Sequence, residues 1–140
     1  MGEEILFRGF LFGHLFKHAK WGIVLADFIE AFLFGVLHLS QSHNSTQALG
    51  VFAVTFVGGL WFAWLYTEWA FNLWVPIVLH CLMNTVWMVF NVADNALGGT
   101  IANIIRLLTV ILSIYMTIKF AKKDTGLVIN RHNLFFNKGN

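Results

Sequence analysis

Residues 48–66 read ALGVFAVTFVGGLWFAWLY and contain no charged side chain. A helix of about 20 apolar residues is long enough to cross the hydrocarbon core of a bilayer. The composition of the whole chain agrees, because 58% of its 140 residues are hydrophobic and only 11% are charged. Soluble domains carry roughly 25% charged residues. The sequence therefore predicts an integral membrane protein.

Further apolar segments lie on both sides of this stretch. Three of them are long enough to be membrane-spanning helices: 21–39, 73–92 and 100–118. Residues 3–16 are shorter and more polar, so we expect a helix shielded by its neighbours rather than by lipid. The chain is thus predicted to be all-α, a multi-pass transmembrane bundle of about five helices. The core covers residues 1–121, and a flexible basic tail covers residues 122–140.

The basic residues indicate the orientation of the bundle, because cytoplasmic segments of membrane proteins retain lysine and arginine. They lie between the first two predicted helices and at or after the last one: Lys17, Lys20, Lys119, Lys122, Lys123, Arg131 and Lys138. We therefore expect a cytoplasmic C-terminus in a protein of the cell membrane. The net charge is only +2, which favours contact with the lipid bilayer over binding of nucleic acid.

The opening segment contains two adjacent glutamates, Glu3 and Glu4, followed by Arg8. Residues four apart share one face of a helix, whereas adjacent residues point about 100° apart. Glu4 is therefore predicted to pair with Arg8 as structural support, because an arginine at membrane depth needs a partner. Glu3 has no such partner, and a free carboxylate in a poorly hydrated site suits a general base.

Two later helices bring further polar groups. His38 lies four residues after Phe34, and Asn84 lies four residues after His80, so each pair shares a helix face. Intramembrane ionisable residues face a cavity or one another. Glu3, His38, His80 and Asn84 could together surround one water molecule and a peptide carbonyl. His38 falls near the outer end of its helix and His80 lies about 10 Å from the inner end of its own, so a tilted, broken or short second helix is needed.

Two acidic residues and one arginine remain inside the predicted helices. Asp27 lies eleven residues before His38, at almost the same helical angle, and Glu30 follows one turn later. Both could line the cavity or neutralise Arg106 of the last helix. We favour the pairing with Arg106, since charged groups inside a membrane are stabilised by one another.

In this order the motifs resemble those of the CAAX protease and bacteriocin-processing family of intramembrane endopeptidases. EEILFR (residues 3–8) matches E-E-x-x-x-R, FGVLH (34–38) matches F-x-x-x-H, and HCLMN (80–84) matches H-x-x-x-N. Each motif alone is a weak signal, and the three in order are specific. The resemblance implies a helical membrane core that cleaves peptides. It also implies upstream helices, so residues 1–121 are expected to be a core that lacks them.

The resemblance further implies roles for individual residues. Glu3 and His38 would activate water, and His80 with Asn84 would form the oxyanion site. Glu3, His38 and His80 would be an acceptable set for Zn²⁺, and a metal-free glutamate mechanism is the alternative. Substrates permitted by the resemblance are membrane-associated proteins or peptides, either of the CAAX type or bacteriocin and signalling leader peptides.

Other classes of function are also compatible with the sequence. A non-catalytic membrane protein, such as an immunity factor, a peptide-binding protein or a truncated inactive remnant, could keep the same cavity. A small transporter or channel subunit is the weaker alternative, because it predicts polar residues spread along a path, whereas the central helix offers only Thr55 and glycines.

Overall fold

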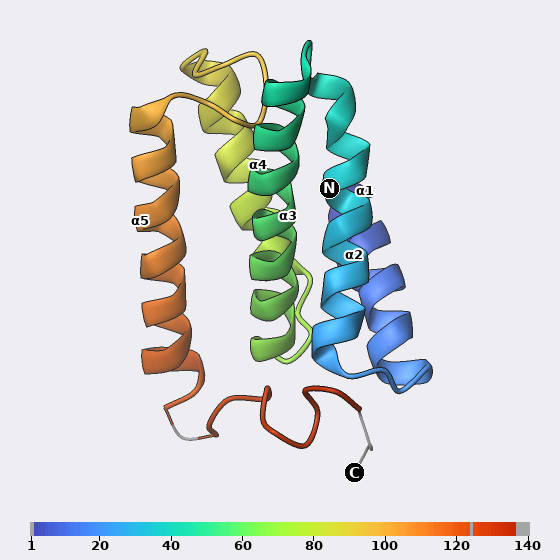
Figure 1. Cartoon of the computed structure of the whole chain (residues 1–140). Helices are drawn as coiled ribbons and strands as arrows, with labels where there is room; N and C mark the ends of the chain where they lie inside the picture. Colours follow the sequence, from blue (N-terminus) through green and yellow to red (C-terminus); the bar gives the residue numbers. More distant parts are fainter. Residues whose placement is uncertain (1, 124, 137–140) are drawn as a thin grey trace.

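The structure is a computed structural model that describes residues 2–123 and 125–136, and within these residues every regular element is helical (Figure 1). The elements are α1 (Gly2–Glu4), η1 (Ile5–Phe12), η2 (His14–His18), α2 (Ile23–Leu37), η3 (His38–Gln41), α3 (Ser45–Glu68), α4 (Trp74–Val89), α5 (Thr100–Met116) and η4 (Thr117–Ala121). The stretches η1, η2 and η4 are π-helical and η3 is a 3₁₀-helix. The predicted all-α class is confirmed.

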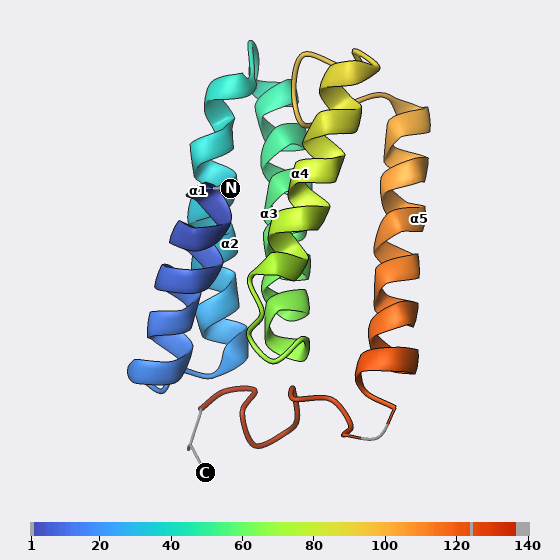
Figure 2. The same ribbon diagram turned by 180° about the vertical axis from the view of Figure 1, so that it is seen from behind.

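The helices run alternately up and down in one bundle. α1, η1 and η2 form a short run that begins at mid-height and descends beside α2 (Figure 1). α2 then rises, α3 descends, α4 rises behind it and α5 descends at the far side (Figure 2). Because the first run starts at mid-height, α1 and its two glutamates lie at mid-height of the bundle rather than at one end.

Three helical segments are long and apolar enough to cross a membrane: Ile23–Gln41, Ser45–Glu68 and Thr100–Phe120. They correspond to three of the predicted spans, and the chain is an integral membrane protein. The predicted span 73–92 is shorter in the structure, because α4 ends at Val89. Phe90 still donates its backbone N–H to the Val86 carbonyl at 3.1 Å. The next residue, Asn91, adopts a positive φ of 47°, a conformation that interrupts a right-handed helix.

α2 and α3 approach closely where Gly59 faces Ala31. A Cβ atom on Gly59 would lie 2.9 Å from the Cβ of Ala31, so a larger residue would force the helices apart. The same absence of a side chain lets the Gly59 carbonyl accept a hydrogen bond from Arg8 Nη2 at 3.4 Å. Gly58 has nothing within 4 Å. Of these two adjacent glycines, therefore, only Gly59 serves close helix approach, as small residues do in membrane bundles.

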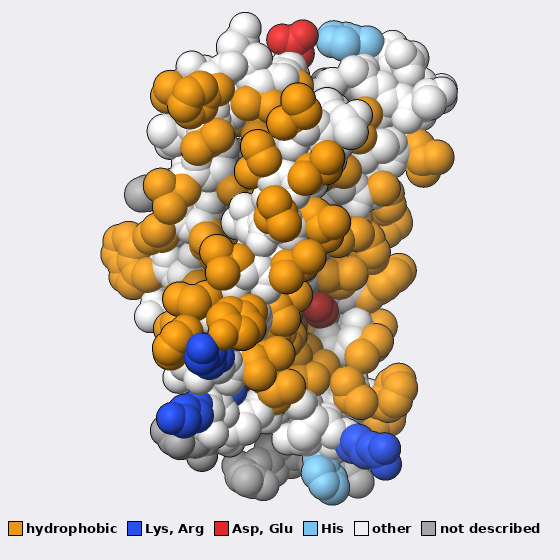
Figure 3. Space-filling model, turned by 90° about the vertical axis from the view of Figure 1, so that its left-hand side faces the viewer, with side chains coloured by type: hydrophobic (Ala, Val, Ile, Leu, Met, Phe, Trp, Pro, Cys, Tyr) orange, Lys and Arg blue, Asp and Glu red, His pale blue; other side chains and the backbone are white. Residues whose placement is uncertain are grey.

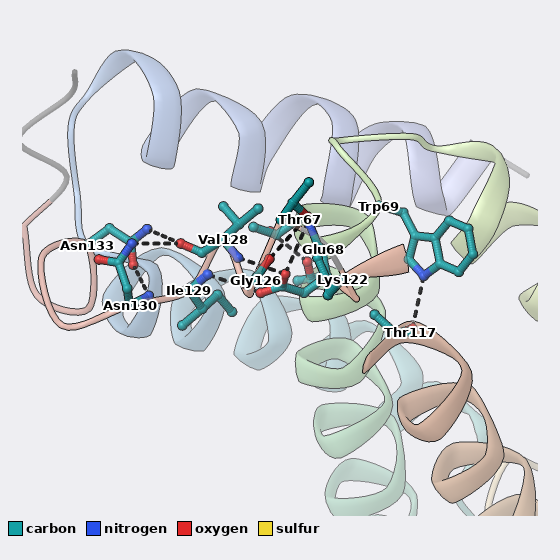
Figure 4. Close-up of polar contacts among 12 residues, drawn as sticks. Thr67, Glu68, Trp69, Thr117, Lys122, Gly126, Val128, Ile129, Asn130 and Asn133 are labelled. Atoms are coloured by element: carbon teal, nitrogen blue, oxygen red, sulfur yellow. Dashed lines mark hydrogen bonds and ion pairs between the residues drawn. The ribbon is translucent and has the colours of Figure 1, made fainter. Parts of the chain in front are cut away.

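The lower end of the bundle is covered by the C-terminal segment, which returns beneath the helices (Figure 1). Figure 4 shows the polar contacts that hold this segment. Glu68, at the end of α3, accepts hydrogen bonds from the backbone N–H groups of Val128 and Ile129 at 2.9 and 3.0 Å. Its carboxylate, which is 1% exposed, also lies 3.6 Å from Lys122 Nζ. Farther along, Gly22 donates its backbone N–H to the Phe135 carbonyl.

The described part of the tail is thus packed against the bundle, which corrects the expectation of a flexible tail. The backbone donors of Val128 and Ile129 find an acceptor in Glu68, so the segment follows a defined path without forming a helix of its own. Lys138, which the prediction also assigned to the tail, lies outside the described residues.

Substitution Glu68→Gln is expected to lower the free energy of unfolding by about 1–3 kcal/mol, because it removes one acceptor and the charge that faces Lys122. Unfolding with sodium dodecyl sulfate in mixed micelles, followed by circular dichroism, measures this change. Asp94→Asn is the control, since Asp94 is exposed and forms no ion pair in the described residues. Equal stability of the two variants would contradict the role of Glu68.

Candidate active site

A buried guanidinium lies at the centre of the site. Arg8 is 0% exposed, and its Nε lies 3.3 Å from Glu4 Oε2 and 3.4 Å from Glu30 Oε1. The guanidinium also lies against the ring faces of Phe34 and Phe62, 4.4 and 5.3 Å from their centroids. The ion pair between Glu4 and Arg8 that the spacing predicts is present. Glu30 from α2 adds a second carboxylate, so Arg8 connects two helical segments.

His80 of α4 joins this group through Glu4. Its Nδ1 lies 2.7 Å from Glu4 Oε1, and an ionised carboxylate only accepts hydrogen bonds, so Nδ1 carries the hydrogen. The His80 ring stacks on Phe62 of α3, with centroids 5.4 Å apart and planes 24° apart. We call Glu4, Arg8, Glu30 and His80 the Arg8 cluster. It fixes the orientation of the His80 ring, as a carboxylate does for a functional histidine.

Glu3 is placed differently from its neighbour. Its side chain is 51% exposed, whereas that of Glu4 is fully buried. Its Oε2 lies 3.7 Å from His80 Nε2, and in the described residues it forms no ion pair with an arginine or lysine. One carboxylate is therefore enclosed in the Arg8 cluster and the other faces open space, as the 100° offset between adjacent helical residues requires.

His38 lies where α2 ends and the tighter helix η3 begins. Its Nδ1 donates a hydrogen bond to the Phe34 carbonyl at 2.8 Å, because a carbonyl oxygen can only accept. Nε2 is consequently the unprotonated nitrogen of the neutral ring, available as a base or a ligand. The Phe34 ring lies 4.4 Å from the His38 ring and 6.3 Å from the His80 ring, measured between centroids. Phe34 therefore contacts both histidines.

One cavity of about 980 Å³ is lined by Glu3, His38, His80 and Asn84. The four residues come from α1, η3 and α4, and Phe34 and Phe62 supply apolar wall. A cavity of this size accommodates a segment of peptide. The structure thus brings all four predicted residues to one space. Direct contact links Glu3 with His80, whereas His38 contacts Phe34 instead of Glu3 or His80.

The residues described by the structure do not provide a three-ligand metal site. No group of three His, Cys, Asp or Glu side chains among residues 2–123 and 125–136 is arranged to hold a metal ion. Glu3 and His80 are close, but His38 is not joined to them. Binding of Zn²⁺ by Glu3, His38 and His80 stays a prediction.

The expected pairing of Asp27 and Glu30 with Arg106 is wrong. Glu30 pairs with Arg8, and Arg106 instead donates to the Asn103 side chain and the Ala96 carbonyl. The contribution of Glu30 to the Arg8 cluster was missed by the sequence reasoning, although a signal was available. Glu30 lies four residues before Phe34, so it occupies the same face of α2 as the second motif.

The chain is similar to one known protein family. A family model described as type II CAAX prenyl endopeptidase Rce1-like matches residues 1–86, a range that contains every residue of the three motifs. The chain belongs to the Rce1-like family. A relative from Bacillus subtilis (strain 168), named "Putative membrane peptidase YdiL", is 34% identical over 83 residues. The match covers 59% of this chain and 30% of that relative. No solved structure matches the chain.

Substitution Arg8→Ala is expected to lower the abundance of the protein in membranes and to destabilise it by about 3–5 kcal/mol, because two buried carboxylates lose their cation. Quantitative immunoblotting of membranes and detergent unfolding measure the two effects. Arg131→Ala is the matched control, since Arg131 is exposed and forms no ion pair in the described residues. Normal abundance and stability of Arg8→Ala would rule out the structural role of the cluster.

Proposed function

We propose that this chain is the catalytic core of an intramembrane endopeptidase that hydrolyses a peptide bond of a membrane-associated protein or peptide. The observation that carries the proposal is the different placement of the two adjacent glutamates, Glu3 and Glu4. Glu4 is enclosed with Arg8 and His80, while Glu3 opens into the cavity that His38 and Asn84 also line. Membership of a family of CAAX prenyl endopeptidases supports the same chemistry.

In the proposed reaction, Glu3 acts as the general base toward a water molecule in the cavity. The carboxylate takes one proton from the water, and the resulting hydroxide attacks the carbonyl carbon of the scissile bond. His38 assists by accepting a hydrogen bond at Nε2, because its Nδ1 is already committed to the Phe34 carbonyl. When the C–N bond breaks, Glu3 returns the proton to the leaving amine.

Stabilisation of the oxyanion is assigned to His80 and Asn84, which share a face of α4. The Asn84 amide makes no hydrogen bond to the described protein, so it is free to donate to a bound substrate. His80 donates from Nε2 when its ring is protonated, and Glu4 at Nδ1 supports that cation. Two donors directed at the developing charge are the usual arrangement in acyl transfer.

The proposed substrates are CAAX-type proteins or leader peptides that reach the cavity from the bilayer. We also propose the cell membrane as the location, with the lower end of the bundle in the cytoplasm. Lysine and arginine side chains gather at that end, as Figure 3 shows, and it contains the described basic residues of the tail. Basic residues at one end are typical of a cytoplasmic surface.

Substitution Glu3→Gln is expected to reduce cleavage by a factor of at least about 100, because the amide cannot take a proton from water. Membrane abundance should be unchanged, since the Glu3 side chain is half exposed and outside the Arg8 cluster. The measurement compares protein N-termini in membranes of cells that express the parent chain or the variant. N-termini that disappear in the variant identify substrates. Identical N-termini would instead favour the non-catalytic peptide-binding protein.

Substitution Asn84→Ala is expected to lower kcat by about 100-fold with little change in KM, because the amide is assigned a bond that strengthens in the transition state. Steady-state cleavage of a substrate found by the N-terminus comparison measures both constants. Thr85→Ala is the matched control, since Thr85 is the next residue of α4 and does not line the cavity. A change confined to KM would remove Asn84 from the oxyanion site.

A further inference from the structure

A second cation lines the same cavity, away from the Arg8 cluster. Arg106, in the membrane-spanning part of α5, donates from Nη1 to Asn103 Oδ1 at 2.6 Å and from Nη2 to the Ala96 carbonyl at 2.8 Å. Its guanidinium also lies over the ring of Trp87 of α4, 4.8 Å from the centroid. These three contacts hold the guanidinium plane in a defined place on the wall of the cavity.

No carboxylate pairs with this cation in the part of the chain that the structure describes. Asp94 lines the same cavity but forms no ion pair with Arg106. The two acceptors of Arg106 are neutral oxygens, and a guanidinium has five N–H donors. An arginine charge within a membrane span is costly without an anion. The Arg106 guanidinium is therefore fixed in position by neutral groups, and no carboxylate of the described residues neutralises its charge. It faces the cavity of the proposed active site.

The spacing along α4 relates this cation to the proposed oxyanion site. Trp87, which Arg106 covers, follows His80 by seven residues and Asn84 by three. At 1.5 Å per residue, the level of Arg106 lies about 10 Å along α4 from His80. An extended peptide covers about 3.3 Å per residue. From Asn84 the same level is only about 4.5 Å away along α4. A peptide whose scissile carbonyl lies between His80 and Asn84 would therefore reach Arg106 after about one to three residues.

We propose that Arg106 binds the C-terminal carboxylate of the peptide substrate, about one to three residues beyond the scissile bond. The inference rests on the endopeptidase function proposed above. A guanidinium offers parallel N–H groups that match the two oxygens of a carboxylate. The walls between the two sites are largely apolar, with Met83, Trp87 and Val110 among the lining residues. A short apolar peptide end therefore fits this space, and its obligatory charge is the terminal carboxylate.

Binding of two matched peptides tests this assignment. The probe is a fluorescent farnesylated peptide that ends in cysteine and three apolar residues, prepared with a free carboxylate or with a C-terminal amide. Dissociation constants are measured by fluorescence anisotropy with the Glu3→Gln chain in nanodiscs, so that the peptide is bound without being cleaved. We expect the amide to bind at least about tenfold more weakly than the acid, because it loses a charge-assisted pair of hydrogen bonds.

Two double variants locate the effect. Adding Arg106→Gln to Glu3→Gln should weaken binding of the acid peptide to the level of the amide. Adding Arg131→Gln should keep the tenfold difference, since Arg131 is an exposed arginine of the tail. Equal binding of acid and amide overturns the inference, and so does a difference that survives Arg106→Gln. Equal binding is also the result expected if Arg106 holds a lipid phosphate instead.

Cleavage of the acid peptide by the parent chain is measured in parallel, so that the two proposals are judged separately. Cleavage without a preference for the acid keeps the endopeptidase and overturns the role of Arg106. Preferential binding of the acid without cleavage keeps the carboxylate site and overturns catalysis. Failure of both peptides to bind overturns the inference together with a CAAX-type peptide substrate.

Discussion

The burial of Arg8 is the constraint on which the rest of the structure depends. Full burial of a guanidinium in an apolar bundle is costly unless anionic partners neutralise its charge. Meeting that requirement brings Glu4 of α1 and Glu30 of α2 to the same point, and Glu4 in turn binds His80 of α4. The carbonyl of Gly59 adds α3. One side chain thus sets the relative positions of four segments before any chemical role is considered.

The proposed chemistry follows from the same constraint. Because Glu4 is used to neutralise Arg8, the adjacent carboxylate of Glu3 is turned away by the helical geometry and left in the cavity. A largely buried, ion-paired cluster behind a half-exposed carboxylate is the arrangement that a preorganised site requires. His80 links the two carboxylates, because its Nδ1 contacts Glu4 and its Nε2 faces Glu3.

Much of this arrangement could be predicted from spacing alone, and the failures have physical causes. The pair of Glu4 and Arg8 followed from a separation of four residues, because a local helix determines that contact. The partner of Glu30 could not be derived in this way. Arg8 and Arg106 lie on different helices, and only the packing of α2 against η1 decides between them. The path of the tail was missed because Glu68 binds backbone groups, which leave no pattern in the sequence.

The close contact at Gly59 has a consequence for how relatives of this protein are recognised. The three motifs lie on the first, second and fourth helical segments, so a search for these motifs alone treats α3 as an interchangeable apolar spacer. Yet any side chain at Gly59 would collide with Ala31 and push the carbonyl away from Arg8. We therefore expect some positions of α3 to tolerate substitution during evolution and others not to. Its lipid-facing positions can exchange one apolar residue for another. A glycine at position 59, in contrast, is expected to be as characteristic of this fold as the charged motifs are.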